Sequence, residues 1–283
     1  MCDVFASGLT LFRPRAAGLV VTVYGDVAQP RQGVLWMGNL IQICGRFGFS
    51  ETNVRTAVSR LVANGQLVGE RVGRKSYYRL TDDAGREYLQ AARQIFLSEP
   101  RADKWCFVAA SDKQDRCLQA LGFARLSDTL WVGPDKPEQR VPGKIWNDAA
   151  PGDPVALREF SERCWDLGEI RSRYAEFVRC FCTLGGADQP IAGLTAEESF
   201  TLRLLLVHAW RGVVLKDPML PLEALGADWP GHEAEALFAK TYLRLSDQAD
   251  HYICQKLEDM DGPLHRQSAS LSRRQNSLRA ILS

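Results

Sequence analysis

Residues 50–81 read SETNVRTAVSRLVANGQLVGERVGRKSYYRLT, and this stretch decides the fold of the N-terminal region. Ser50 can cap a helix whose first turn carries the acidic Glu51, and Gly65 can end that helix. At about 100° per residue, one arc of the helix is apolar. That arc consists of Val54, Ala57, Val58, Leu61 and Val62, and the opposite arc consists of Thr52, Arg55, Thr56, Ser59 and Arg60. The segment therefore predicts a helix with one buried and one exposed side.

The exposed arc differs from that of an ordinary surface helix. A helix that only packs on a core would carry Glu and Lys on its outer side, whereas this one carries short hydroxyl side chains and arginines. Short side chains allow a close approach to base edges, and arginine reaches guanine or phosphate oxygens. The hydroxyls could instead bond to the local backbone. The predicted DNA contacts on this helix are Thr52, Asn53, Arg55, Thr56, Ser59 and Arg60.

Two strands are predicted after this helix, at residues 66–72 and 76–81. The turn at 73–75 reads Gly-Arg-Lys, so a glycine permits a tight turn and two basic residues lie at its tip. From residue 46 to residue 79 the chain has seven basic and two acidic side chains, a local excess of five positive charges (7 − 2). Such an excess is expected of a surface that contacts nucleic acid. The alternative is a helical bundle with an incidental basic hairpin.

The second strand of this hairpin alternates between two faces. Alternation predicts that Tyr78 and Leu80 face inward while Tyr77 and Arg79 face outward. A core position remains the alternative for Tyr77. The predicted DNA contacts of the hairpin are Arg71, Arg74, Lys75 and Tyr77.

Two further helices are predicted upstream, at residues 16–27 and 36–47, and Gly48 can end the second. Three helices followed by a basic hairpin are typical of a winged helix-turn-helix, which we place at residues 12–81. In such a domain the third helix enters the major groove and the hairpin contacts the neighbouring backbone.

The remaining chain falls into four parts. Asp82 or Asp83 can cap a connecting helix at 82–99. Apolar strands and a helix then alternate before a Pro- and Gly-rich loop or boundary at 135–154, which predicts a small α+β domain at 100–154. Every later pattern is helical, including a capping box at Thr195, so residues 155–262 form a helical domain. The tail at 263–283 is polar and is predicted to be mobile. The fold class is therefore mainly α with α+β parts.

Composition excludes several classes of protein. Net charge is +1, 46% of the residues are hydrophobic, and no stretch approaches the length of a membrane span. Eight cysteines lack any CxxC pair, which fits a reducing cytoplasm and argues against a metal centre. Two arginines before the apolar run at 16–24 resemble a signal peptide, but the run is short and Asp26 follows closely. We expect a cytoplasmic protein without metal.

Several motifs together resemble the PaaX family of bacterial repressors, named for phenylacetic acid catabolism. The matching stretches are TVYGD at 22–26, VRTAVSRL at 54–61, GRKSYYRLT at 73–81, CWDL at 164–167, DP at 217–218 with LP at 220–221, and ADWPG at 227–231. They run in order from about residue 16 to residue 250, and the hairpin motif and the last two are the most specific.

The resemblance implies a winged-helix reader, a small ferredoxin-like middle domain and a helical C-terminal effector domain. It also implies a homodimer on palindromic operator DNA, with half-sites about 34–36 Å apart or a multiple of that. Release from DNA would follow binding of an aryl-acyl-CoA such as phenylacetyl-CoA. The family commonly has His-Glu-Tyr-Arg-Arg in the C-terminal domain, whereas residues 208–212 here read His-Ala-Trp-Arg-Gly. If this segment lines the effector pocket, the inducer can differ from phenylacetyl-CoA.

The effector candidates combine aromatic rings with cations. A ring would stack on an aryl or adenine group, and an arginine would meet phosphate or carboxylate. A Trp or His on a mostly apolar helix is more often part of the core. The candidates are Arg203, His208, Trp210, Arg211 and Trp165.

The sequence offers weaker signals for two other functions. An enzyme acting on CoA thioesters would need a nucleophile, and His208 with Cys180 or Cys182 is the one conceivable pair, because no GxSxG, HExxH or phosphate-binding loop occurs. A nuclease-like middle domain would need clustered carboxylates, whereas Asp112 and Asp115 fall on a predicted helix. Neither is favoured, and we expect no enzyme activity.

Overall fold

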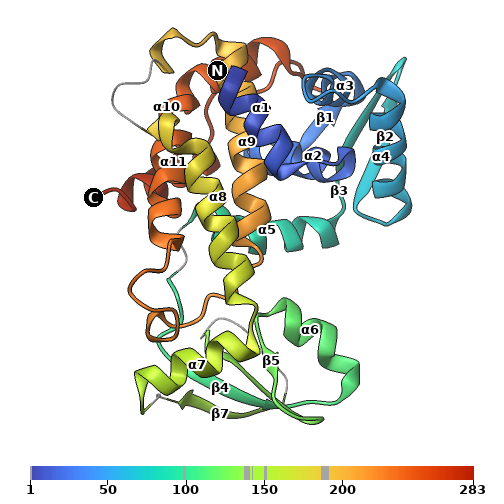
Figure 1. Ribbon diagram of the computed structural model, residues 1–283. Coiled ribbons are helices and arrows are strands. Elements are labelled where there is room, and N and C mark those ends of the chain that lie inside the picture. The colour runs from blue at the N-terminus through green and yellow to red at the C-terminus, as the bar shows by residue number, and fades with distance from the viewer. Residues whose placement is uncertain (1, 98–99, 137–140, 142, 150–151, 186–190) are drawn as a thin grey trace. The chain divides into compact units, whose positions relative to one another are not determined.

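Residues 16–80 form three helices and three strands. The computed structural model of the protein describes residues 2–97, 100–136, 141, 143–149, 152–185 and 191–283. The helices of this region are α2 (Ala16–Val23), α3 (Met37–Gly45) and α4 (Glu51–Ala63), and the strands are β1 (Val34–Trp36), β2 (Leu67–Val72) and β3 (Lys75–Leu80) (Figure 1). The strands make an antiparallel sheet in the order β1-β3-β2. The predicted hairpin is present, with Gly73 at φ +58° in its turn.

Strand β1 was not expected from the sequence. It has three residues, and Trp36, predicted to begin a helix, is its last residue and pairs with Tyr77. A strand this short has no alternation of its own to reveal it. Its pairing with β3 decides its conformation, so only the tertiary structure shows it.

The predicted helix at 16–27 extends further and changes type. After α2 the chain forms a π-helix, η1 (Tyr24–Ala28), and a 3-10 turn, η2 (Gln29–Arg31). The side chain of Asp26 lies in the π-helical turn and is fully buried. Helix α1 (Cys2–Phe12), which was not predicted, precedes α2. The connecting helix α5 (Asp82–Phe96) is capped by Thr81, whose Oγ1 accepts from the backbone N–H of Ala84 at 3.3 Å, rather than by an aspartate.

A second antiparallel sheet lies in the middle of the sequence. Its strands are β4 (Trp105–Ala109), β5 (Ala124–Arg125), β6 (Leu130–Pro134) and β7 (Lys144–Ala149), in the order β5-β6-β4-β7. Between β4 and β5 lie η3 (Asp112–Gln114) and α6 (Asp115–Ala120), and Leu118 of α6 packs on Val108 and Trp131 of the sheet. Strand β7 lies within the predicted loop at 135–154, because pairing with β4 orders a segment whose composition resembles a loop.

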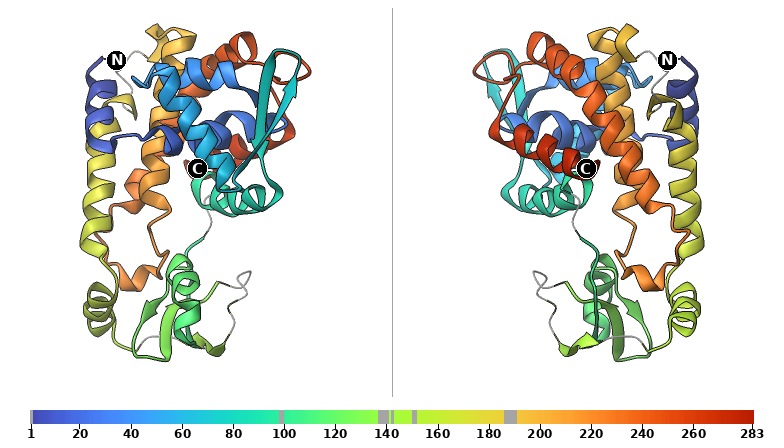
Figure 2. Two further views of the ribbon diagram at one scale, coloured as in Figure 1. Left: turned by 90° about the vertical axis from the view of Figure 1, so that its right-hand side faces the viewer. Right: turned by 90° about the vertical axis from the view of Figure 1, so that its left-hand side faces the viewer.

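The C-terminal half is helical, as predicted. Its elements are α7 (Pro154–Cys164), α8 (Leu167–Gly185), η4 (Ile191–Gly193), α9 (Ala196–Val214), η5 (Leu222–Ala224), α10 (Gly231–Lys256) and α11 (Ala269–Ala280). The capping box before α9 is present, since Thr195 Oγ1 accepts from the N–H of Glu198 at 3.2 Å. The segment expected to be a mobile tail instead contains α11, which lies against α5 and η2 (Figure 2). Leu271, Arg274 and Leu278 of α11 are buried, so tertiary contacts hold a helix that is polar overall.

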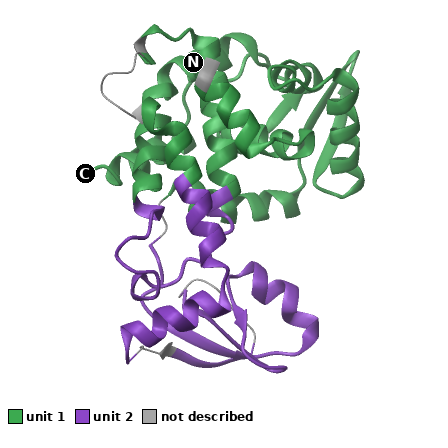
Figure 3. Ribbon diagram, in the orientation of Figure 1, with its two compact units in different colours: residues 1–98, 176–212, 233–283 green, residues 99–175, 213–232 purple. Residues whose placement is uncertain are grey.

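Two compact units divide the chain, and neither is continuous in sequence (Figure 3). Unit 1 contains residues 1–98, 176–212 and 233–283, and unit 2 contains residues 99–175 and 213–232. The N-terminal helices and hairpin therefore share a unit with α9, α10 and α11. The linear boundaries expected from composition differ from this division, because composition does not reveal contacts between distant segments.

Candidate nucleic-acid interface

A reciprocal cap fixes the start of α4. Ser50 Oγ accepts a hydrogen bond from the backbone N–H of Asn53 at 3.3 Å. In return, Asn53 Oδ1 accepts from the backbone N–H of Ser50 at 3.3 Å and from its hydroxyl at 2.7 Å. Such a cap satisfies N–H groups that a helix leaves unpaired at its start. Asn53, a predicted DNA contact, is thus also a capping residue.

Helix α4 has the two sides that the sequence predicts. Val54, Ala57, Val58 and Leu61 are buried, whereas Val62, assigned to the apolar arc, is 39% exposed. The exposed residues include all six predicted contacts, Thr52, Asn53, Arg55, Thr56, Ser59 and Arg60. Burial of one side holds the helix against α2, α3 and β2 and leaves the hydroxyl and arginine side open.

The cations of this surface differ in their partners. Arg55 Nε lies 2.7 Å from Glu51 Oε1, one turn earlier on α4, and both side chains are more than half exposed. Within the described part of the chain, no ion pair involves Arg60 or Arg74. At the hairpin, Arg71 Nε donates to the carbonyl oxygen of Gly73 at 3.2 Å. Arg60 and Arg74 are therefore the cations most available to an external anion.

Lys75 stands apart because a distant carboxylate holds it. Its Nζ forms an ion pair with Glu258, which follows α10, and lies 4.6 Å from the centre of the Trp36 ring. The hydrogen bond from Lys75 to Glu258 raises the pKa of the lysine. Sequence reasoning missed Glu258, since a single acid 183 residues away leaves no local signal.

Tyr77 faces the interior, which corrects the predicted outward orientation. Its side chain is 7% exposed, while Tyr78 is half-buried and Arg79 is exposed. Strand β3 lies between β1 and β2 and packs against α3 and α5. Alternation shows only that Tyr77 and Tyr78 lie on opposite faces of the strand, and this packing decides which face is buried. We therefore remove Tyr77 from the phosphate-contact candidates.

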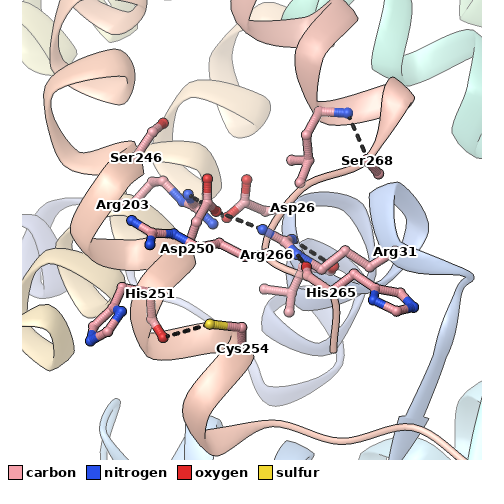
Figure 4. A network of polar contacts seen from close by, with 12 residues as sticks. Asp26, Arg31, Arg203, Ser246, Asp250, His251, Cys254, His265, Arg266 and Ser268 are labelled. Carbon is pink, nitrogen blue, oxygen red and sulfur yellow. Dashed lines mark hydrogen bonds and ion pairs between the residues drawn. The ribbon is translucent and has the colours of Figure 1, made fainter. Parts of the chain in front are cut away.

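Arg203, an effector candidate, lies in a buried cluster of charges (Figure 4). Its Nε is 3.0 Å from Asp26 Oδ2, and its Nη1 is 2.7 Å from Asp250 Oδ1. Asp250 Oδ1 is also 2.6 Å from Nη2 of Arg31. Burial opposes the charged form of Arg203, but the two aspartates outweigh it and hold its pKa above the ordinary value. These contacts give Arg203 a structural role in joining η1 to α9 and α10.

Helix α11 contributes Arg274 to the cluster. Arg274 Nη1 lies 3.1 Å from Asp26 Oδ1, and the guanidinium stacks over Phe96 at 3.6 Å from the ring centre. The hydroxyl of Tyr242 donates to Asp26 Oδ1 at 2.9 Å. The cluster was not predicted, although Asp26 belongs to the TVYGD motif at 22–26 that carried the family resemblance. That motif was the available signal.

His208 and Arg211 lie one turn apart on α9, beside α2. The ring Nδ1 of His208 is 2.8 Å from Thr22 Oγ1, and the Thr22 hydroxyl donates to the carbonyl oxygen of Gly18 at 3.0 Å. The tautomer of the neutral ring decides whether His208 Nδ1 donates to Thr22 or accepts from it. Burial, helped by Arg211, lowers the pKa of His208 to about 4. Among the described residues, Arg211 forms no ion pair, and burial lowers its pKa.

Of the two tryptophan candidates, Trp210 is buried in a core and Trp165 is partly buried. Trp210 is 2% exposed, stacks on Phe238 with ring centres 5.0 Å apart, and donates from Nε1 to the carbonyl oxygen of Ile95 at 3.1 Å. Trp165 belongs to unit 2, where its Nε1 donates to the carbonyl oxygen of Gly122 at 2.9 Å. The structure therefore brings Arg203, His208, Trp210 and Arg211 together on α9 in unit 1 and assigns Trp165 to the other unit.

The structure also describes the thiols and carboxylates named for an enzyme or a nuclease. Cys180 is buried, which raises the pKa of its thiol to about 11, whereas Cys182 is exposed. A thiol with a raised pKa is a poor nucleophile. In unit 2, Arg125 lies 2.8 Å from Asp112 and 3.1 Å from Asp115. Within the described ranges, no group of three or more His, Cys, Asp or Glu side chains could hold a metal ion.

No single helix in the described part of the chain is long and apolar enough to cross a membrane. Residues 4–12 and 16–31 meet the criterion only as a pair bent by 117°. The second of these segments contains the buried charges of Asp26 and Arg31.

Comparison with known proteins identifies the family. The fold and the site define a mainly helical protein with small antiparallel sheets and an exposed basic helix next to a basic hairpin. Residues 15–84 match the family described as PaaX-like protein, and residues 165–255 match the PaaX-like protein C-terminal domain. The chain is 33% identical over 270 residues to the transcriptional repressor PaaX of Escherichia coli (strain K12), covering 87% of this chain and 85% of the relative. The chain belongs to the PaaX family.

Proposed function

We propose that the chain is a transcriptional repressor that binds double-stranded DNA through α4 and the β2–β3 hairpin. The observation that carries the proposal is the exposed side of α4, where short hydroxyl side chains and arginines lie together without a core-facing role. The name of the Escherichia coli relative, a transcriptional repressor, supports the same function.

Helices α2, α3 and α4 followed by a basic hairpin support a winged helix-turn-helix. In this proposal the exposed side of α4 enters the major groove, and Arg60 reaches a base edge or a phosphate. Arg74 at the hairpin tip binds the neighbouring phosphate backbone. Thr56 and Ser59 permit close approach because their side chains are short. The family membership supports a cytoplasmic homodimer on palindromic DNA.

The remaining helices supply the regulation in this proposal. A small-molecule inducer, an aryl-acyl-CoA or a related acid, would release the DNA. His208 and Arg211 are the inducer contacts that we retain, because Arg211 is a partly buried cation without an acidic partner among the described residues. In unit 2, the sheet order β5-β6-β4-β7 supports a ferredoxin-like arrangement, with the difference that α7 follows β7 instead of preceding it.

The DNA proposal is tested by mobility shift with the DNA upstream of the chain's own gene, over a range of salt concentrations. The double variant Arg60→Ala/Arg74→Ala removes two cations that have no ion pair. We expect it to bind about 10- to 100-fold more weakly, with a salt slope reduced by about two, because each phosphate contact contributes about one unit of slope.

The matched control is Arg116→Ala/Arg163→Ala, which removes the same charge from exposed positions of α6 and α7. This control should bind DNA as the natural chain does. Equal affinity of the two double variants, or binding by the natural chain that ignores salt, would contradict the proposed interface. A thermal-shift series with phenylacetyl-CoA, free CoA and phenylacetate separately tests the inducer, since a ligand of the folded state raises its unfolding temperature.

A further inference from the structure

Glu258 holds the one residue of the hairpin tip that is not free to meet DNA. Its carboxylate forms an ion pair with Lys75 Nζ, and the same Nζ lies over the Trp36 ring, 4.6 Å from the ring centre. The neighbouring Arg74 makes no ion pair within the described residues. Two adjacent cations of the same turn are therefore in different electrostatic states.

The carboxylate is carried by a fixed loop rather than by a mobile arm. The backbone oxygen of Glu258 accepts from Asn39 Nδ2 at 2.7 Å and from the N–H of Trp36 at 3.4 Å. Asp259 closes the turn that follows, because its Oδ1 accepts from the N–H groups of Asp261 and Gly262 at 2.8 and 3.1 Å. The flanking Leu257 and Leu264 are each 1% exposed. Main-chain bonds to β1 and α3 thus position the Glu258 side chain beside Lys75.

A carboxylate and a DNA phosphate compete for the same ammonium group of a lysine. Both are anionic oxygen acceptors for its ammonium group. A phosphate that approaches Lys75 must displace Glu258 or remain beside its negative charge. Either event lowers the DNA affinity that Lys75 contributes. A phosphate that approaches Arg74 has no carboxylate to displace.

We infer that Glu258 is an affinity-determining residue of the DNA interface, which occupies Lys75 in place of a DNA phosphate and weakens DNA binding. The inference rests on the proposed function and adds a residue to it. It also connects the end of α10 to DNA affinity, since Glu258 lies two residues beyond Lys256, the last residue of that helix.

The test is a titration of a short, fluorescein-labelled duplex of mixed sequence, followed by anisotropy between about 50 and 200 mM KCl, because phosphate contacts do not depend on sequence. Glu258→Gln removes the charge and keeps the backbone oxygen. We expect about threefold to tenfold tighter binding at low salt and a salt slope steeper by about 0.9, the value of one added phosphate contact.

The control is Glu233→Gln, the same change at an exposed position in the first turn of α10, roughly 35 Å along the helix from its C-terminal end. It should leave affinity unchanged. In a Lys75→Met background, Glu258→Gln should have no effect beyond twofold, because the lysine that it releases is absent. Should Glu258→Gln fail to fold, Glu258→Asp, whose carboxylate is one methylene shorter, must show tighter binding.

The possible outcomes separate this inference from the proposed function. A natural chain that binds the duplex without salt dependence would overturn the proposed function. Salt-dependent binding by the natural chain with unchanged or weaker binding by Glu258→Gln would overturn the role of Glu258 alone. A gain in affinity that persists in the Lys75→Met background would also overturn it, since the effect would then be one of general charge.

Discussion

At the scale of single residues, burial decides whether a cation is available to a ligand or is held by neighbouring carboxylates. Arg203 reads from the sequence as a cation available to a ligand, but it is fully buried and holds two aspartates. Arg60, exposed on α4, has no such partner among the described residues. A sequence states the charge of a residue, whereas its partners depend on which segments the fold brings together.

Replacing Asp26 by asparagine should destabilise the protein by about 3–5 kcal/mol, because removing one partner leaves buried arginines uncompensated. Arg203 and Arg274 would each lose a carboxylate contact. The free energy of unfolding from urea titration measures the effect. Asp247→Asn is the control, since Asp247 pairs with Arg266 at the surface and such pairs contribute at most about 1 kcal/mol. Equal losses in the two variants would contradict the importance of the cluster.

Stability should decrease as the pH falls from about 6.5 to about 4, and His208 should cause part of that decrease. Its pKa is about 4 in the folded protein, so between these values the unfolded chain binds a proton that the folded protein does not. The contribution is roughly 3 kcal/mol at its maximum.

His208→Asn keeps a side chain that can hydrogen-bond to Thr22, as donor or acceptor, and removes the titration. Chemical denaturation at several pH values should therefore show a shallower loss of stability in this variant. The same pH dependence with asparagine would assign the effect to other groups.

At the scale of elements, the sequence predicted those helices and strands whose own apolar pattern or turn residues are sufficient to identify them. Helix α4 and the β2–β3 hairpin lie where the sequence predicted them, and the segment predicted to be helical contains α7 to α10. Strands β1 and β7 were missed, because each is ordered by a neighbouring strand rather than by its own pattern. Helix α11 was missed for a related reason, since its only large apolar side chains are Leu271 and Leu278, which are buried by other segments.

Removing α11 by ending the chain at residue 267 should destabilise unit 1. The truncation exposes the surface covered by Leu271 and Leu278 and removes Arg274 from Asp26. Burial of each leucine contributes about 1.5–3 kcal/mol, so we expect a loss of at least about 3 kcal/mol. Thermal denaturation followed by circular dichroism measures it. A chain ending at Ala280, which retains all of α11, is the control and should unfold as the natural chain does.

At the scale of the whole molecule, side chains of the N-terminal region form ion pairs and hydrogen bonds with segments from the C-terminal part of the sequence. Arg31 pairs with Asp250, Arg46 pairs with Glu197 and contacts Tyr252, and Lys75 pairs with Glu258. All of these contacts lie within unit 1. The candidate DNA interface is therefore part of the same compact unit as α10 and most of α9, and α9 carries the inducer contacts proposed above.

A fragment of residues 1–97 tests this dependence. It retains the predicted winged helix-turn-helix and α5 but leaves Asp26 and Arg31 without their partners on α9 and α10. We expect a broad thermal transition at lower temperature and binding of a hydrophobic dye, whereas the full chain unfolds cooperatively. A fragment that unfolds as sharply and at the same temperature as the full chain would show an autonomous domain.

The basic helix followed by the basic hairpin, which the sequence showed first, was determined by the sequence alone. Each is a local pattern. Helix α4 follows from apolar residues that recur at helical spacing, and the hairpin follows from a glycine turn between two strands. The tertiary structure alone decided which cations of that surface are free. Arg74 has no partner among the described residues, Lys75 is held by Glu258, and Tyr77 is buried. The physical reason is that charge and burial depend on contacts between segments up to 183 residues apart, which no local pattern records.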